Sequence, residues 1–163
     1  MSIKLGKAQK LTSPNPFTLI TSLKEDKETN VMALSWWTYL ANSPATICIS
    51  LGKDGLTHEL IDKNNEFGLN VVGEELKENG FKTGITSGRD IDKVKEFNIP
   101  LKDAKIISPK VIPNSRLVLE CRVNKKIELP NNYIYFAEVV SMDSDENIEA
   151  IYAMDGYSRL DTI

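Results

Sequence analysis

The chain has 163 residues, of which 41% are hydrophobic and 26% are charged, a composition typical of a globular protein. Its net charge of −3 argues against a nucleic-acid partner, which would need a basic surface. No apolar run reaches the ~20 residues of a membrane span, and the N-terminus lacks the apolar core of a signal peptide. We therefore expect a cytoplasmic protein without a membrane or nucleic-acid partner, and one domain over residues 1–163.

Three strands are expected at the start of the chain. Segments 17–23, 30–37 and 45–51 are rich in β-branched and aromatic residues and are separated by polar or proline-containing turns. In segment 30–37 neither alternate set is purely polar, which predicts a strand covered on both faces. Its centre nevertheless holds two small residues, Ala33 and Ser35. Something other than bulky side chains is therefore expected to lie over them.

A helix is expected next, with Leu56, Leu60 and Ile61 on one face and Thr57 able to cap its first turn. Segment 67–72 returns to a strand pattern, and 74–98 contains two short helical patterns separated by glycines. After Pro100 the β pattern resumes, in segments 104–112, 116–129, 133–143 and 149–154. Strands dominate and no βαβ alternation occurs, which favours one antiparallel barrel with helices on its outside.

The cysteines and the histidine limit the chemistry. Cys48 and Cys121 are far apart and match no metal-ligand spacing, and both lie in strand-like segments, where a free cysteine behaves as a small hydrophobic residue. His58 is the only histidine of the chain. We expect no metal site and no catalytic triad.

The turn that links strand 45–51 to the helix predicts an anion site. Gly52 and Gly55 let the backbone approach a ligand, and the first N–H groups of the helix favour a phosphate. Lys53 adds a positive charge, and Ser50 and Thr57 add hydroxyl groups. The alternative is a plain loop with a capping threonine and a solvated lysine. His58 is either a second ligand contact or a surface residue at the helix start.

Two further stretches allow two interpretations each. Segment 84–89, GITSGR, is either a second ligand-binding turn or a connector whose glycines relieve strain. The pair Trp36-Trp37 is typical of a core or an interface.

Taken together, these stretches resemble a known family. Asn30-Val31-Met32, Trp36, the turn at 52–58 and Ser87-Gly88-Arg89 with Asp92-Lys93 have the order and spacing of the flavin reductase-like, FMN-binding split-barrel family, especially its flavoredoxin-type members. The resemblance covers about Pro16 to Ile99, with a weaker echo in 155–160, DGYSRL. Trp37 and Val94 depart from the family pattern. The resemblance implies a mainly β fold: a Greek-key, antiparallel split barrel with a few peripheral helices.

The resemblance also implies a set of FMN contacts. Strand 30–37 would pass along the isoalloxazine ring, with room left by the small residues; the turn at 50–58 would take the phosphate; and Lys93 would lie near the ring or a second subunit. The residues implied are Asn30, Met32, Ala33, Leu34, Ser35, Trp36, Ser50, Gly52, Lys53, Thr57, His58 and Lys93. No catalytic side chain is expected, because the flavin N5 carries the chemistry.

Three functions remain open at this point. The first is an oxidoreductase that takes electrons from a nicotinamide dinucleotide, NADH or NADPH, through bound FMN to free flavin, iron or a protein acceptor. The second is an electron carrier with tightly held FMN, no NAD(P)H activity of its own and a protein partner. The third is a binding protein that holds a different ligand in the same barrel. In all of them we expect a homodimer, because the tryptophan pair and strands such as 133–140 supply more apolar surface than one small barrel hides.

Overall fold

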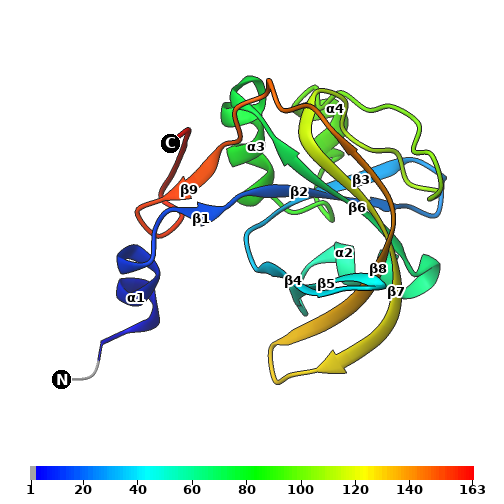
Figure 1. Cartoon of the computed structure of the whole chain (residues 1–163), viewed down its shortest axis with the longest axis horizontal. Helices are drawn as coiled ribbons and strands as arrows, with labels where there is room; N and C mark the ends of the chain where they lie inside the picture. Colours follow the sequence, from blue (N-terminus) through cyan, green and yellow to red (C-terminus); the bar gives the residue numbers. More distant parts are fainter. Residues whose placement is uncertain (1–2) are drawn as a thin grey trace.

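The structure, a computed structural model, describes residues 3–163. Figure 1 follows the chain from α1 at the N-terminus to the short C-terminal strands. The elements in chain order are α1 (Leu5–Leu11), β1 (Asn15–Pro16), β2 (Thr18–Leu23), β3 (Thr29–Leu34), β4 (Trp37–Asn42), β5 (Ala45–Gly52), α2 (Leu56–Asn64), β6 (Glu66–Val72), the 3₁₀ helix η1 (Glu74–Leu76), α3 (Lys77–Gly84), α4 (Lys93–Glu96), β7 (Ser115–Glu128), β8 (Asn132–Ser144), β9 (Tyr152–Met154) and β10 (Arg159–Asp161).

Seven strands form one antiparallel sheet in the order β3-β2-β6-β7-β8-β5-β4. The long strands β7 and β8 run through its middle, and β-bulges near Glu120 and Val123 bend them. The apolar side chains inside the curved sheet form the main core, which includes Ile20, Ile49, Phe67 and Leu119. The prediction of a mainly β, antiparallel fold with a few peripheral helices is confirmed.

The two end strands of this sheet, β3 and β4, are consecutive in the chain. Segment 30–37 was predicted as one strand, but it breaks at Ser35 and Trp36, and β4 continues from Trp37 to Asn42. The Trp37 N–H turns back to the Ser35 carbonyl (3.2 Å), and the Trp36 carbonyl accepts from the Ser50 N–H (2.9 Å). The chain therefore crosses from one end of the sheet to the other within two residues.

A smaller sheet joins the two ends of the chain. Strand β9 pairs with β1 on one side and with β10 on the other. This sheet, β2 and helix α3 enclose a second core that contains Phe17, Leu19, Leu76 and Leu160. Among residues 3–163, no helix is long and apolar enough to cross a membrane.

The prediction of a strand over 104–112 is wrong. This segment is a loop whose only ladder contact is an isolated bridge between Lys102 and Val111. The buried carboxylate of Glu120 on β7 accepts the N–H groups of Lys105 (2.8 Å), Ile106 (2.7 Å) and Ile107 (3.1 Å). Those N–H groups are satisfied by a side chain, so they have no need of a neighbouring strand.

Candidate functional site

A large cavity of about 420 Å³ lies where β3 bends into β4. Strand β3 and the bend form one wall, and the end of β5, helix α3 and the C-terminal segment form the others. The wall is mostly apolar, which is usual for a site that holds an organic cofactor. Its lining consists of Gln9, Phe17, Met32, Ala33, Leu34, Ser35, Trp36, Ser50, Gly52, Phe81, Gly84, Ile85, Asn132, Ala153, Tyr157 and Leu160.

Small residues keep this cavity open where helix α3 meets β3. A Cβ atom added at Gly84 would lie 3.3 Å from the Cβ of Ala33. Larger side chains at these two positions would therefore push the helix away from the strand or fill the space between them. Ala33 and Ser35 border the cavity, in agreement with the expectation that something other than bulky side chains lies over them.

A small cavity of about 120 Å³ adjoins the large one, since Met32, Ala33 and Gly84 line both. It lies between the start of α2 and the loop that precedes α4. Its remaining lining is largely polar: Asn30, Gly55, Leu56, Thr57, Thr83, Thr86, Ser87, Gly88 and Lys93.

Lys93 is the cation of the small cavity. Its side chain lies almost entirely inside the protein, with 5% of the residue exposed. The ammonium group donates to the carbonyl oxygens of Thr83 (3.1 Å) and Thr86 (3.3 Å), and none of the ion pairs within residues 3–163 includes it. Burial lowers the pKa of Lys93 to about 8. A buried cation held only by neutral carbonyl groups is stabilised by any anion that enters the cavity.

The N-terminus of α2 faces the same cavity. Gly55 occupies the N-cap position and offers no side-chain cap, so no side chain within residues 3–163 caps the first turn of this helix. Thr57 is not the cap that the sequence suggested: its hydroxyl accepts from the Asn30 side-chain amide (3.2 Å) and so ties α2 to β3. An anion beside Lys93 would therefore also meet helix N–H donors.

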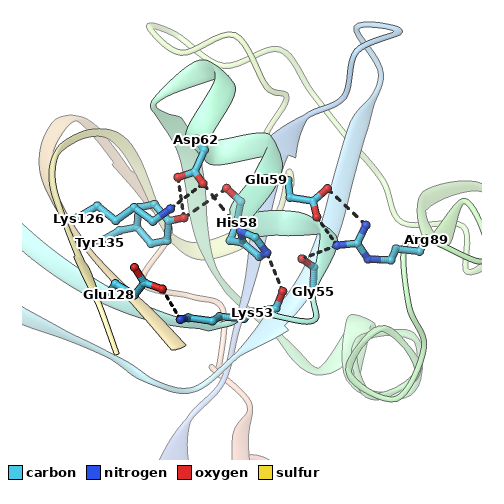
Figure 2. A network of polar contacts seen from close by, with 9 residues as sticks. All are labelled: Lys53, Gly55, His58, Glu59, Asp62, Arg89, Lys126, Glu128 and Tyr135. Carbon is cyan, nitrogen blue, oxygen red and sulfur yellow. Dashed lines mark hydrogen bonds and ion pairs between the residues drawn. The ribbon is translucent and has the colours of Figure 1, made fainter. Parts of the chain in front are cut away.

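Arg89 fixes this helix start from the opposite loop, as Figure 2 shows. Its guanidinium donates to the carbonyl oxygens of Asp54 (3.2 Å) and Gly55 (3.2 Å). It also forms a two-bond ion pair with Glu59 on α2, at 2.6 and 3.3 Å. The hydrogen bond from Arg89 lowers the pKa of Glu59. Arg89 thus holds together the two walls of the small cavity.

Lys53 and His58 line neither cavity; Figure 2 shows the polar contacts that they make instead. The Lys53 ammonium is 2.5 Å from the Glu128 carboxylate on β7, and this hydrogen bond lowers the pKa of Glu128. The His58 Nε2 donates to the Lys53 carbonyl (2.8 Å), and its Nδ1 has no hydrogen-bond partner among residues 3–163. Both side chains stabilise the back of the turn, so the predicted phosphate contact of Lys53 does not fit this geometry.

The other predicted residues are brought together. Met32, Ala33, Leu34, Ser35, Trp36, Ser50 and Gly52 line the large cavity, and Asn30, Thr57 and Lys93 line the small one. The sequence interpretation missed the wall formed by Phe17, Phe81, Asn132 and Tyr157, whereas Gly84 and Ile85 belong to the segment 84–89 that it named as a possible ligand-binding turn. For Tyr157 a signal existed, since it lies within the quoted stretch DGYSRL; Phe17 and Phe81 resemble ordinary core residues in the sequence.

Comparisons with known proteins agree with this architecture. Solved structures with the same fold include a flavoredoxin from Methanosarcina acetivorans (TM-score 0.87, 22% identity, 100% of this chain and 90% of that one). An NADH:FAD oxidoreductase from Streptomyces globisporus, SgcE6, is also similar (TM-score 0.85, 16% identity, 100% and 95%). A structure from Shewanella frigidimarina that is described as having a split barrel domain is similar too (TM-score 0.86, 16% identity, 97% of this chain and 86% of that one), which confirms the predicted fold class.

The sequence comparisons define the family. The sequence model of a protein family, the flavin reductase like domain, matches residues 11–161 of this chain. The chain is 30% identical over 149 residues to YddH of Escherichia coli K12, an uncharacterised protein, with 90% of this chain and 79% of that protein covered. This chain therefore belongs to the flavin reductase-like domain family.

Proposed function

We propose that this protein binds FMN and uses it to transfer electrons from NADH or NADPH to an acceptor: free flavin, iron or a protein. We further propose that it acts in the cytoplasm and that residues 1–163 form one flavin reductase-like domain. Two free cysteines are in keeping with a reducing compartment.

The observation that carries the proposal is Lys93. A cation that is nearly fully buried without a carboxylate partner is costly unless a ligand supplies the negative charge. The phosphate of FMN supplies it, and the first turn of α2 offers further N–H donors. We therefore assign the phosphate to Lys93 and the helix start, in place of the Lys53 contact expected from the sequence.

The isoalloxazine ring is then assigned to the adjoining large cavity. The ring is flat and mostly apolar, and it needs one wall of small residues and a few polar groups at its edge. Ala33 and Gly84 supply the small wall, the backbone of Met32 to Ser35 supplies donors and acceptors, and Trp36 covers the opening. The ribityl chain crosses between the cavities at Met32 and Ala33, which line both.

FMN, when bound, supplies hydride acceptance at N5, so the protein itself needs no acid or nucleophile. The protein orients the isoalloxazine ring, excludes water from one face of the ring and sets the electrostatic charge around it. Lys93 places a positive charge within the site, which favours the more negative form of any bound cofactor. The exposed side chain of Ile85, at the mouth of the large cavity, leaves an approach for a nicotinamide.

We also propose a homodimer with the mouth of the large cavity near its interface. Trp36 is 45% exposed and Ile85 is 72% exposed, and both line the cavity. Two exposed apolar side chains favour contact with a second subunit, which would lie beside the mouth and leave it open to the nicotinamide. Sedimentation of the FMN-loaded protein at micromolar concentration would give a dimer; a monomer would contradict this part of the proposal.

The binding part is tested with Lys93→Met and Lys53→Met. A charge-assisted hydrogen bond contributes about 1.5–3 kcal/mol, so Lys93→Met should lower the affinity for FMN by about 10- to 100-fold. Riboflavin, which lacks the phosphate, should be nearly unaffected. Lys53→Met is the matched control and should bind both ligands as the unmodified protein does. Equal binding of FMN by all three proteins, or no FMN binding at all, would refute the assignment.

The electron-transfer part is tested by anaerobic titration of the FMN-loaded protein with NADH and NADPH. Rapid bleaching of the flavin absorbance, followed by turnover when free flavin or a ferric chelate is added, supports the oxidoreductase. Bleaching by dithionite but by neither nicotinamide would instead identify an electron carrier.

A further inference from the structure

A third cavity, which the proposed function does not use, lies along the seam where the barrel is not closed by hydrogen bonds. It has a volume of about 390 Å³ and lies between β4 on one side and β2, β6 and β7 on the other. We call it the seam cavity. Phe17 lines both it and the large cavity, so one aromatic side chain separates the two.

The tryptophan pair divides between these two cavities. Trp36 lines the large cavity, and Trp37 lines the seam cavity. The indole N–H of Trp37 is buried and has no hydrogen-bond partner among residues 3–163. This nitrogen has almost no accessible surface, so a ligand in the seam cavity would contact the ring carbons of Trp37 and not its N–H.

The seam cavity has flat, apolar walls. Trp37 and Tyr39 contact each other edge to face, with ring centroids 5.1 Å apart and planes at 72°. Val71, Leu117 and Ile151 face them from the other side. A cavity of this size with aromatic and aliphatic walls accommodates a flat organic ring.

One cation lies at the rim. The Nη1 of Arg116 donates to the carbonyl oxygens of Glu146 (3.2 Å) and Ile148 (2.7 Å), which orients the guanidinium. None of the ion pairs within residues 3–163 includes Arg116, and its Nε and Nη2 donate to no group there. Glu146 is the one acidic side chain in the lining. A ligand with a single negative charge, near Arg116 and away from Glu146, is therefore favoured over one with two.

From these contacts we infer that the seam cavity binds a flat aromatic monocarboxylate, its ring between Trp37 and Val71 and its carboxylate on Arg116. The unused N–H groups of Arg116 are donors, and a carboxylate is an acceptor only. The site does not depend on the proposed function, because Phe17 is the only residue that it shares with the large cavity and Lys93 is not part of it.

The test is calorimetric titration of the full-length protein with 2-naphthoate, with and without saturating FMN. We expect binding in both conditions and no competition with FMN. The neutral analogue 2-naphthalenemethanol should bind more weakly. Arg116→Gln should lower the affinity for 2-naphthoate by about tenfold and leave the affinity for the alcohol unchanged, because only the carboxylate interacts with the charge of Arg116.

Arg159→Gln is the matched control, since Arg159 is an exposed arginine that does not line the seam cavity. Val71→Trp should fill the cavity and abolish binding of both compounds; if this variant does not fold, Leu117→Phe replaces it. Three results would each overturn the inference: no binding of naphthoate by the unmodified protein, displacement of naphthoate by FMN, or equal affinities in Arg116→Gln and Arg159→Gln.

Discussion

The indole N–H of Trp36 donates to the hydroxyl of Tyr157 across 3.0 Å. This bond joins the bend between β3 and β4 to the C-terminal segment, and both residues line the large cavity. Tyr157 adopts a positive φ of 73°, a backbone conformation that is uncommon for residues other than glycine. The opening of the cavity is thus formed by residues from opposite ends of the chain.

Tyr157→Phe removes only this hydroxyl. We expect a loss of FMN affinity of about two- to tenfold, since a hydrogen bond of this kind contributes about 0.5–1.5 kcal/mol and here orients Trp36. The measurement is the FMN dissociation constant from flavin fluorescence quenching. Tyr39→Phe, at an exposed tyrosine outside the large cavity, is the control; the same affinity in both variants would argue against a role for the bond.

Arg89 should act on FMN through the start of α2 and not by direct contact. Arg89→Gln removes the donors to Asp54 and Gly55, so we expect FMN to dissociate faster and to bind about tenfold more weakly. Glu59→Gln breaks the ion pair and leaves those two bonds in place. Its effect should be smaller, because exposed ion pairs contribute little. Stopped-flow dissociation rates that rank the two variants in the opposite order would refute this.

The pH dependence of FMN binding should follow Lys93. Its pKa is about 8 without ligand, and a bound phosphate raises that pKa because it favours the charged amine. Lys93 is therefore protonated in the complex. The contribution of Lys93 to the FMN affinity is complete below about pH 8 and is lost as the pH rises above that value. Titrations with FMN at several pH values check this. Riboflavin should show a flatter profile, and Lys93→Met should remove the slope; an unchanged slope in that variant would exclude Lys93.

Glu120 should contribute to stability and not to ligand binding. Glu120→Gln places an amide N–H₂ among three backbone donors, so at least one of them loses its acceptor. We expect a loss of about 1–3 kcal/mol in the free energy of unfolding. Urea unfolding measures it, with Glu138→Gln, at an exposed position on β8, as the control. A change in FMN affinity that exceeds the change in stability would contradict this assignment.

Much of this architecture could be predicted from the sequence, because alternating apolar residues mark β2, β5 and β6, and the turn at 52–58 has the chemistry of a helix start. The loop at 104–112 could not, since its apolar pattern resembles a strand and the carboxylate that prevents pairing, Glu120, lies on another element. Lys53 and Lys93 illustrate the same limit at the site. Lys53 lies within the turn at 52–58, for which a phosphate contact was expected. Its partner Glu128 is 75 positions away in the sequence, and the bond to Glu128 holds the Lys53 side chain away from the cavities. Lys93 reaches the cavity only because α4 packs against β3.

The order of the strands has one more consequence, for protein engineering. The two ends of the large sheet are joined only by Ser35 and Trp36, while the pairing of β1 with β9 holds residues 15–16 beside residues 152–153. A circular permutant that begins at Trp36, with a linker long enough to join the C-terminal segment to helix α1, would keep every strand pairing of the large sheet. The new N- and C-termini of the permutant, Trp36 and Ser35, would both lie at the large cavity. A reporter group or an electrode tether could be attached there without an added loop.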